Sequence, residues 1–516
     1  MATQEATKNY FKRLKNKNLQ ATSTCLFGKT GFRVSKIGFG GYRIHHNSIE
    51  HAKALRYALL NGFNLIDTSS NYTDGGSEML IGNLLQEMID RDEISRDEIV
   101  LISKVGYVQG QNLQIAQQHA ADGQPFPDMV TYMDGCWHCI HPEFLEDQLS
   151  RTLERLNQPF LDIYLLHNPE YFLAHQKKVD GVDLQKARQD YYRRIKLAFE
   201  WMESKVAEGK IKAYGISSNT FAYPSNEFEF TSLEETLAIA ESISPNHFYR
   251  VIQFPFNLFE TGACFEKNQF NNSRTLLDVA RDNQLATLVN RPLNAMVGND
   301  MLRLASFREN PAEEIKTSFA QLLSTLTDLE HQFRDKYLSF MPKEIPRDNF
   351  RQVFSLSQSL SQATTRFQTW EHWDHVRQNI IIPQTFSTLN YLREKLKDNA
   401  DWSNWSEHYA QNLIALLETI NRHYENIAQK RSSRLFRFLE NSEHTLQDSE
   451  TLSQQVLQIL TSVDGVNCVL LGMRRTPYVE DALAALQQKS VEDPEKILTT
   501  CHKTIRTIIH NNAPKQ

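Results

Sequence analysis

Three short apolar runs in the first third of the chain end in residues that can donate, accept or hold a proton. The run LIDTSSNY carries Asp67 and Tyr72, IVLISKVGY carries Lys104, and LDIYLLHNP carries His167. Apolar runs of this length that turn polar at one end are typical of buried strands. The carboxyl ends of the strands of a parallel barrel gather on one face, so a barrel would bring these four side chains into one site.

Taken singly, each of these residues has an ordinary structural explanation. Asp67 can cap a turn, Tyr72 can lie at a sheet edge, Lys104 can be a surface lysine and His167 a hydrogen-bonded core histidine. Their occurrence in order, at the ends of successive expected strands, favours a shared function. A carboxylate, a phenol, an amine and an imidazole together form a set that can transfer protons.

The rest of the chain alternates between strand and helix patterns, which predicts an α/β fold of the (β/α)8 barrel type. Before the first strand, two short extended pieces around Gly28 and Gly31 predict a hairpin within residues 24–36. Strands are expected at 36–44, 65–67, 99–107, 161–169, 211–219, 251–259, 285–293 and 466–474. Helices are expected at 48–62, 77–89, 142–156, 193–209, 232–243, 274–283 and 478–487.

The four candidate residues and their spacing resemble the catalytic tetrad of the aldo-keto reductase family. The resemblance implies that Tyr72 is the proton donor in carbonyl reduction, and the chemistry of the four groups agrees with this role. A free tyrosine has a pKa near 10, and the ammonium of Lys104 would lower it. Asp67 would hold Lys104 charged, and His167 would orient the substrate oxygen or help to relay the proton.

The resemblance implies a nicotinamide cofactor bound across the barrel mouth, and no GxGxxG motif after a strand indicates a separate Rossmann domain. Ser218, Asn219 and Gln253 match the residues that hold the nicotinamide carboxamide in this family. Gly41 and Tyr42 match the loop beside the nicotinamide ribose, and Asp67 is also expected to contact the cofactor.

A second group of residues matches the family's adenosine end. Gly472, Arg474 and Arg475 lie where the family holds the 2′-phosphate. Two guanidiniums suit a phosphate dianion, which favours NADPH over NADH. A solvated turn between strand and helix would also explain these arginines.

The chain departs from the family pattern at two places. Asn290 stands where an aromatic residue usually stacks on the nicotinamide, and the adjacent Arg291 could clamp the pyrophosphate. Near the end of the chain, Asp481 takes the place of a glutamate and Ala482 that of an asparagine that contact adenine. These changes put the nicotinamide stack and the adenine contact in question.

The chain has 516 residues, whereas one barrel needs roughly 250, so there is room for insertions. We expect an N-terminal tail at 1–23, the first part of the barrel at 24–295, a helical insertion between strands seven and eight at 296–450, the last part of the barrel at 451–490 and a C-terminal tail at 491–516. The basic cluster in the first 17 residues is interpreted as part of a solvated tail.

Apolar stripes with helical spacing predict that the insertion is a small bundle. The stripes are Ile315, Phe319, Leu322, Leu326, Leu329 and Phe333; Val353, Leu356, Leu360, Ala363, Phe367 and Trp370; and Tyr409, Leu413, Leu416 and Ile420. Because it leaves the barrel after strand seven, we expect it on the catalytic face, as a substrate lid or as a docking surface for a protein partner.

Two further interruptions are interpreted as loops at 107–141 and 168–192. The first ends in CWHCIH, which contains Cys136, His138, Cys139 and His141. These residues could bind zinc, but structural zinc sites usually separate their ligand pairs further. We therefore expect a polar loop without a metal.

Composition is ordinary for a soluble enzyme, with 41% hydrophobic and 23% charged residues. The net charge of -6 gives no general attraction to nucleic acid or acidic membranes. No apolar run approaches the roughly 20 residues of a membrane span. The N-terminus lacks the apolar core of a signal peptide. Six cysteines in so long a chain do not suggest a disulfide scaffold, and we expect a cytoplasmic protein.

Three functions remain open at this point. The first is an NADPH-dependent oxidoreductase acting on a small carbonyl or alcohol, which the complete tetrad favours. The second is a regulatory or partner-binding protein on a reductase barrel, with the helical insertion as its interaction module. The third, a metal-dependent barrel hydrolase, is disfavoured because no carboxylate and histidine cluster recurs at the strand ends.

Overall fold

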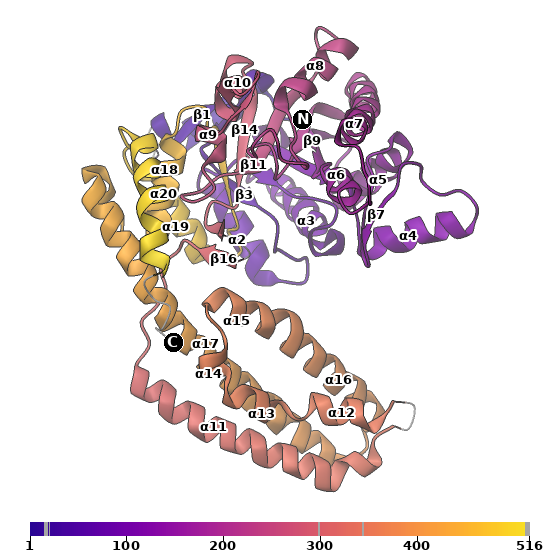
Figure 1. Ribbon diagram of the computed structural model, residues 1–516, viewed down its shortest axis with the longest axis vertical. Coiled ribbons are helices and arrows are strands. Elements are labelled where there is room, and N and C mark those ends of the chain that lie inside the picture. The colour runs from indigo at the N-terminus through magenta and orange to yellow at the C-terminus, as the bar shows by residue number, and fades with distance from the viewer. Residues whose placement is uncertain (15–18, 20, 298–299, 343–344, 511–516) are drawn as a thin grey trace. The chain divides into compact units, whose positions relative to one another are not determined.

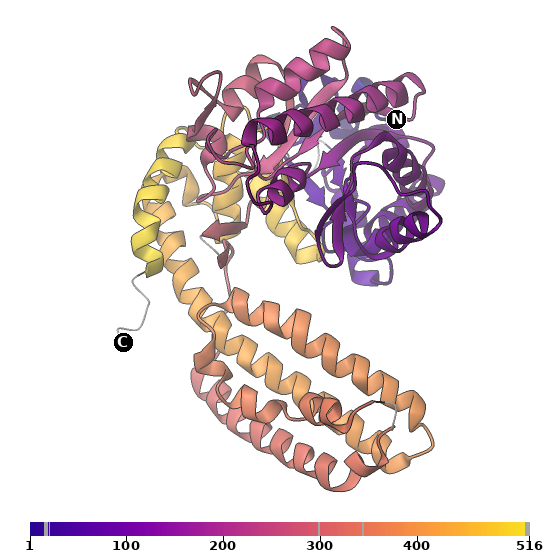
Figure 2. The same ribbon diagram turned by 45° about the vertical axis from the view of Figure 1, so that its right-hand side comes forward.

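The computed structural model describes residues 1–14, 19, 21–297, 300–342 and 345–510. The chain divides into two compact units (Figures 1 and 2). The first contains Met1–Ala295 and Leu439–Arg506, and the second contains Met296–Phe438 and the described residues from Thr507 on.

The first unit is a closed barrel of eight parallel strands, which confirms the predicted fold class. Each strand pairs with the one before it and the one after it in the chain, and the eighth closes on the first. The strands are β3 (Ile37–Gly40), β4 (Leu65–Asp67), β5 (Val100–Val105), β9 (Leu161–His167), β10 (Ile211–Ser217), β11 (Tyr249–Pro255), β14 (Ala286–Asn290) and β17 (Cys468–Leu471).

Helices surround these strands (Figure 1). They are α2 (Ile49–Leu60), α3 (Gly76–Asp90), α5 (Pro142–Arg155), α7 (Leu184–Ala207), α8 (Leu233–Ile243), α10 (Leu276–Asp282), α18 (Leu452–Ser462) and α19 (Thr476–Gln487). Helix α18 is not among the helices expected from sequence. Thr451 caps its N-terminus by accepting a hydrogen bond from Gln454 N. The smaller elements α9 (Gly262–Phe265), β12 (Lys267–Gln269) and β13 (Arg274–Thr275) lie between β11 and α10.

A hairpin of β1 (Thr24–Leu26) and β2 (Arg33–Ser35) confirms the predicted N-terminal hairpin. Its Phe27 and Phe32 are buried in the same cluster as the inward-facing side chains of the barrel strands. Gly28 has a φ of +51°, and a Cβ there would lie 2.5 Å from Ala286 N at the start of β14. The hairpin therefore covers the amino-terminal end of the barrel, opposite the strand ends that carry the candidate residues.

The predicted solvated N-terminal tail is wrong for the first 14 residues, which contain helix α1 (Gln4–Arg13). Thr3 caps this helix, and Tyr10 is fully buried with its hydroxyl 2.6 Å from Leu59 O. The backbone nitrogen of Ala2 lies 2.5 Å from Asp162 Oδ1. An aromatic side chain with a satisfied hydroxyl is enough to dock the segment, in spite of its many lysines.

The predicted C-terminal tail also needs correction, because it contains helix α20 (Pro494–His510). Its side chains Ile497, Leu498 and Cys501 are buried, as is the preceding Val491. They recur at helical spacing, so the segment docks through one apolar face. Residues 511–516 lie outside the described part of the chain.

The two segments interpreted as loops are folded. Residues 107–141 contain a three-stranded sheet of β6 (Tyr107–Val108), β8 (Cys136–His138) and β7 (Val130–Met133), together with α4 (Gly110–Ala121). Residues 168–192 contain α6 (Tyr171–Gln176) and the first turns of α7. The strands of the small sheet are only two to four residues long, which is too short for a sequence pattern to reveal.

The second unit is helical, as the apolar stripes predict, and its main segment, Met296–Phe438, comes between β14 and β17 in the chain. Its helices are α11 (Ala312–Gln332), α12 (Arg347–Val353), α13 (Leu356–Ser361), α14 (Ala363–Arg366), α15 (Trp370–Val376), α16 (Ile382–Lys395) and most of α17 (Ala400–Ser442). One apolar core joins them around Phe333, Trp373, Trp402 and Leu413. The short strands β15 (Asn294–Val297) and β16 (Asp300–Arg303) form a pair that the helical pattern did not predict.

Across the described residues, no helix is both long enough and apolar enough to cross a lipid bilayer.

Candidate active site

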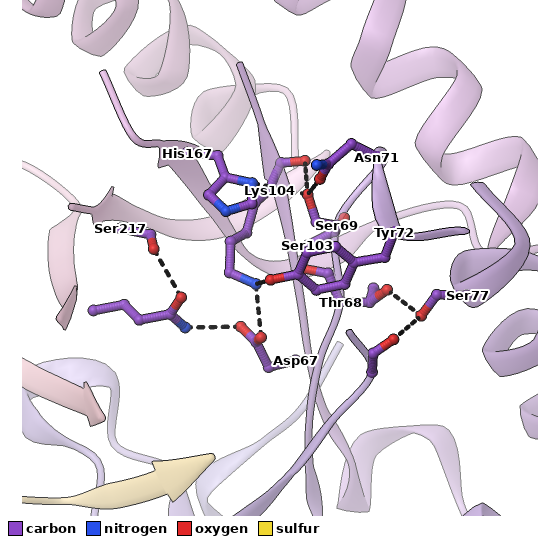
Figure 3. A network of polar contacts seen from close by, with 12 residues as sticks. Asp67, Thr68, Ser69, Asn71, Tyr72, Ser77, Ser103, Lys104, His167 and Ser217 are labelled. Carbon is purple, nitrogen blue, oxygen red and sulfur yellow. Dashed lines mark hydrogen bonds and ion pairs between the residues drawn. The ribbon is translucent and has the colours of Figure 1, made fainter. Parts of the chain in front are cut away.

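The buried ammonium group of Lys104 contacts the side chains of Asp67 and Tyr72 (Figure 3). Lys104 Nζ lies 2.6 Å from Asp67 Oδ2, 3.1 Å from the Tyr72 hydroxyl and 2.9 Å from Thr68 O. Lys104 is fully buried and Asp67 nearly so. The three donor hydrogens of the ammonium therefore have an acceptor each, and the lysine is held in one position.

Tyr72 is placed by the short loop that follows β4. Thr68 N donates to Ile102 O and Ser70 N donates to Lys104 O, so the loop begins as a continuation of the barrel. After Tyr72 the backbone turns sharply, with φ of 49° at Thr73 and 55° at Asp74. Left-handed residues of this kind need support from their surroundings. One support is the hydrogen bond from the Thr73 hydroxyl to Ile44 O, at 2.8 Å.

His167 completes the set from the end of β9. Its ring centroid lies 5.9 Å from that of Tyr72 and 4.7 Å from that of Tyr107, both in edge-to-face geometry. Its Nδ1 lies 3.0 Å from Ser69 Oγ, and its backbone oxygen accepts a hydrogen bond from His138 Nε2 at 2.7 Å. The structure thus brings all four tetrad candidates together.

Burial dominates the electrostatics of the site. Burial raises the pKa of Asp67, and the charge of Lys104 opposes this effect. Burial acts to lower the pKa of Lys104, but Asp67 and Tyr72 together outweigh it, so the pKa of Lys104 is raised and the amine stays charged. Burial, with the positive charge of Lys104, holds the pKa of His167 well below 6.5, so the imidazole is neutral.

The sequence predicted that Lys104 lowers the pKa of Tyr72, and the structure shows that this is one of two opposing effects. Burial raises the pKa of Tyr72 above 10, and the Lys104 ammonium acts to lower it. Burial is the larger effect, because the phenolate would lose its solvation. Tyr72 is therefore a protonated acid at neutral pH.

The polar network continues from Asp67 to the opposite wall of the barrel. Gln253 Nε2 donates to Asp67 Oδ1 at 3.0 Å, and Ser217 Oγ donates to Gln253 Oε1 at 2.8 Å (Figure 3). Ser218 does not join it, since its buried hydroxyl contacts Thr220 and Thr231 instead.

Gly41 and Tyr42 lie beside the tetrad. Gly41 N donates to Asp67 O at 2.8 Å, and a Cβ at Gly41 would lie 2.8 Å from Ser77 Oγ. Tyr42 is 61% exposed, and its ring packs edge-to-face on Tyr72 at 5.1 Å. An exposed aromatic face next to Tyr72 can take a flat ring or a sugar.

The two asparagine candidates, Asn219 and Asn290, differ in their hydrogen bonding. The backbone nitrogen of Asn219 donates to the buried carboxylate of Glu170 at 2.8 Å. Asn290 Oδ1 is buried and has no hydrogen-bond partner within the described structure. A buried acceptor without a partner is unfavourable by itself, which fits a residue that contacts a ligand.

Two of the charged candidates are already paired. Arg291 Nη2 lies 2.5 Å from Glu260 Oε1, so its charge is partly neutralised before it meets any phosphate. Asp481 accepts hydrogen bonds from the hydroxyls of Thr451 and Ser453 and from the Gln454 amide. Its carboxylate thus ties α19 to the first turn of α18, which leaves it poorly placed for adenine.

The side chains around the start of α19 have fewer or looser polar contacts than those of Arg291 and Asp481. Arg475 is the N-cap of α19, its side chain is 54% exposed, and it makes one loose ion pair of 3.5 Å with Glu50. In the part of the chain that the structure describes, Arg474 makes no hydrogen bond or ion pair. A Cβ at Gly472 would meet no atom within 4 Å.

Comparison with known proteins agrees with this geometry. Residues 36–227, which include all four tetrad candidates, match the Aldo/keto reductase family. This match places residues 36–227 of the barrel unit in the aldo-keto reductase family. The matched segment ends before Gln253 and α19, so the residues expected to contact the adenosine end of a cofactor lie outside it.

Similar proteins are distant in sequence. The chain is 25% identical over 229 residues to aldo-keto reductase family 1 member A1 of Sus scrofa, which covers 43% of this chain and 55% of that protein. It is 23% identical over 195 residues to the NADPH-dependent D-xylose reductase of Meyerozyma guilliermondii, covering 37% and 50%. The chain thus spans about half the length of these relatives. The glycerol dehydrogenase structure from Gluconobacter oxydans is 15% identical, with a TM-score of 0.46 and coverage of 96% and 99%.

Sequence reasoning missed Ser217, which the structure places in the polar network of the barrel. Side chains alternate between the two faces of a strand. Ala213 of β10 points into the barrel core, so Ser217, four residues later, points inward too, whereas Ser218 does not. The same alternation is present in the sequence and could have identified Ser217.

The residues considered as zinc ligands have other partners. His138 contacts the backbone of His167, and His141 Nδ1 accepts a hydrogen bond from Glu143 N at the start of α5. Cys136 Sγ lies 3.0 Å from Gln109 Nε2, and Cys139 Sγ lies 3.4 Å from Pro127 O. Among the residues with described positions, no group of three His, Cys, Asp or Glu side chains could hold a metal.

Proposed function

We propose that this chain is an NADPH-dependent oxidoreductase that interconverts a small carbonyl compound and its alcohol, with Tyr72 as the general acid and base. The observation that carries the proposal is the position of Lys104 Nζ, which contacts both Asp67 Oδ2 and the Tyr72 hydroxyl inside the barrel. A lysine at that place stabilises the phenolate that remains once the proton has left.

The chain's own residues can carry the proton chemistry. Tyr72 would give its proton to the oxygen of the substrate as negative charge develops there, and Lys104 would stabilise the resulting phenolate. Asp67 keeps Lys104 charged and fixed. The neutral His167 would orient the substrate oxygen by a hydrogen bond. When bound, the nicotinamide would supply or accept the hydride.

The start of α19 fits the 2′-phosphate of NADPH. No side chain caps this helix, so the positive end of its dipole is open to an anion. Arg474 and Arg475 add two positive charges beside them, and only one loose ion pair competes. The unpartnered Asn290 Oδ1 at the end of β14 and the Ser217–Gln253 pair beside Asp67 supply polar groups for the nicotinamide carboxamide.

The experiment is a fluorescence titration with NADPH and with NADH, followed by turnover assays on aldehydes, ketones and sugars and on the matching alcohols. We expect NADPH to bind more tightly than NADH and to be oxidised by at least one carbonyl compound. Absence of binding by either nucleotide would refute the proposal. Tighter binding of NADH would refute the role of the two arginines and leave the tetrad chemistry standing.

A further inference from the structure

The hydroxyl of Ser69 lies among three acceptors, although it has only one proton to give. Ser69 Oγ is 2.7 Å from Asn71 Oδ1, 3.0 Å from His167 Nδ1 and 3.4 Å from Lys104 O. Ser69 is 1% exposed, so water does not donate to the acceptors that the Ser69 hydroxyl leaves without a proton. The direction of each hydrogen bond is therefore coupled to the others.

The shortest of these contacts determines which acceptor the hydroxyl proton of Ser69 points to. Asn71 Oδ1 can only accept, so the Ser69 proton points to it. His167 Nδ1 must then carry a hydrogen and donate it to Ser69, since otherwise two lone pairs would face each other at 3.0 Å. Because His167 is neutral, its Nε2 then carries no hydrogen and can only accept.

The hydrogen-bond chain continues outward from Asn71 through two further groups. Asn71 Nδ2 donates to Gln109 Oε1 at 3.3 Å, and Gln109 Nε2 donates to Cys136 Sγ at 3.0 Å. Each amide can turn over by exchanging its oxygen and nitrogen, and a thiol can donate as well as accept. The whole chain can therefore reverse its direction without moving any backbone atom.

In the reversed direction the Cys136 thiol donates to Gln109, Gln109 donates to Asn71, and Asn71 donates to Ser69. Ser69 then donates to His167 Nδ1, and the imidazole carries its hydrogen on Nε2 instead. The two directions thus present opposite groups at the same point of the site: an acceptor in one and a donor in the other.

We propose that Ser69, Asn71, Gln109 and Cys136 form a reversible hydrogen-bond chain that sets the tautomer of His167. This inference rests on the proposed function, in which Nε2 of His167 faces the substrate oxygen. An alcohol donates a hydrogen bond and is bound better by the accepting Nε2, whereas a carbonyl accepts one and is bound better by Nε2–H. The four residues act through His167 and are positioning residues.

The tautomer of His167 affects the binding of the carbonyl and of the alcohol. It does not change which direction of the reaction is favoured overall. The equilibrium constant of the reaction fixes the ratio of kcat/KM between the two directions, whatever the tautomer. A change of tautomer can, however, shift the relative affinity for the carbonyl and the alcohol. One net hydrogen bond gained or lost corresponds to a shift of roughly three- to tenfold.

Two substitutions of similar size at one position should have opposite effects. Asn71→Asp can only accept from Ser69, so it locks His167 in the Nδ1–H form. Asn71→Leu accepts nothing, so Ser69 is released to donate to His167 Nδ1, which is nearer than Lys104 O. A merely structural role of Asn71 would shift both variants in the same direction.

The first measurement is the ¹⁵N NMR spectrum of protein labelled with ¹⁵N-histidine, with His167→Asn used to assign the His167 signals. We expect Nδ1–H for the unliganded wild type and for Asn71→Asp, and Nε2–H for Asn71→Leu. The same tautomer in both variants, or Nε2–H in the unliganded wild type, would overturn the inference. The wild-type spectrum keeps the test valid if a variant fails to fold.

The second measurement compares the affinity of the NADPH complex for benzaldehyde with that of the NADP⁺ complex for benzyl alcohol. We expect Asn71→Leu to favour the aldehyde and Asn71→Asp the alcohol, by roughly three- to tenfold each. In a Ser69→Ala background both effects should disappear, and their persistence would mean that Asn71 acts by its charge or size. If neither NADPH nor NADH binds, the proposed function fails, while the NMR result still decides the tautomer.

Discussion

The barrel and the helical unit differ in what they bury. The barrel encloses a connected polar network that includes a full positive charge on Lys104 and a carboxylate on Asp67. The helical unit encloses a continuous apolar core, in which Phe333, Trp402 and Trp405 lie in contact distance of one another. Its buried Glu330 is satisfied locally by the backbone and hydroxyl of Ser357.

This difference indicates what each region contributes. Burying an ion pair contributes little net stability, because desolvation offsets the attraction between the charges. Groups arranged in that way can, however, stabilise charge that develops in a reaction. A core held mainly by the packing of aromatic and aliphatic side chains contributes stability. Substitutions in the barrel network should therefore affect activity first, and substitutions in the helical core should affect stability first.

The largest expected effect is that of Tyr72→Phe. This variant loses the only proton donor of the proposed reaction, so kcat on any accepted carbonyl should fall by roughly 10²- to 10⁴-fold. NADPH affinity should stay within a few-fold, because the proposed phosphate contacts lie at α19. Steady-state kinetics and a fluorescence titration measure both quantities. Near-normal turnover would remove Tyr72 from the tetrad.

Phe333→Ala is the corresponding change in the helical unit. Phe333 is fully buried, and its ring centroid lies 4.4 Å from that of Phe354. Its truncation should lower the free energy of unfolding of this unit by about 3–5 kcal/mol. Hydrogen exchange followed by mass spectrometry would report the two units separately. Peptides from α17 should exchange faster, while peptides from β5 and β9 keep their protection.

The matched control in the same unit is Phe340→Ala, because Phe340 is 66% exposed. It removes the same atoms without opening a cavity, so hydrogen exchange in α17 should stay as in the wild type. Equal destabilisation by both substitutions would mean that the aromatic core is not what stabilises the helical unit.

Lowering the pH should destabilise the barrel through protonation of His138. Burial lowers the pKa of His138 from 6.5 to about 4. Between these values the unfolded chain binds a proton that the folded chain does not, so stability falls as pH falls through this window. The full loss amounts to about 3 kcal/mol. His138→Gln should remove this part of the pH dependence of barrel unfolding between pH 7 and pH 4.5.

His372→Gln serves as the control for that experiment, since His372 is exposed and lies in the helical unit. It should leave the pH dependence of barrel unfolding as it is in the wild type. If His138→Gln also leaves it unchanged, a group other than His138 accounts for the acid sensitivity.

Arg474→Gln should weaken NADPH binding by about 1.5–3 kcal/mol and change NADH binding little, because it removes one charge-assisted phosphate contact. The measurement is a pair of titrations with the two nucleotides. Arg434→Gln, on α17, removes an arginine elsewhere and is the charge control. Equal losses for NADPH and NADH would show that Arg474 does not contact the 2′-phosphate.

The smallest effect on cofactor binding is expected from replacing residues 296–438 by a short Gly/Ser linker. We propose that this unit is a substrate lid or a partner-binding module. A lid predicts unchanged NADPH affinity with altered KM and a wider substrate range. A partner-binding module predicts unchanged kinetics on small carbonyls. A large loss of NADPH affinity in a folded variant would contradict both.

The sequence alone determined the barrel and the four tetrad positions for a physical reason. Strand and helix patterns are local, and parallel strands of a barrel present their carboxyl ends on one face. Asp67, Tyr72, Lys104 and His167 could therefore be assigned to one site before any contact was known. The helical nature of the insertion was predictable in the same way, because apolar stripes recur within single helices.

The tertiary structure alone decided which partners these side chains have. Arg291 is paired with Glu260 from another strand–helix loop, and the Asp481 carboxylate is taken up by the start of α18. Tyr10 docks a segment that looks like a solvated tail by composition. Burial raises the pKa of Tyr72, so Tyr72 is a weaker acid than the effect of the Lys104 charge alone would predict. Each of these outcomes depends on groups far apart in the chain, and local patterns carry no information about their distance.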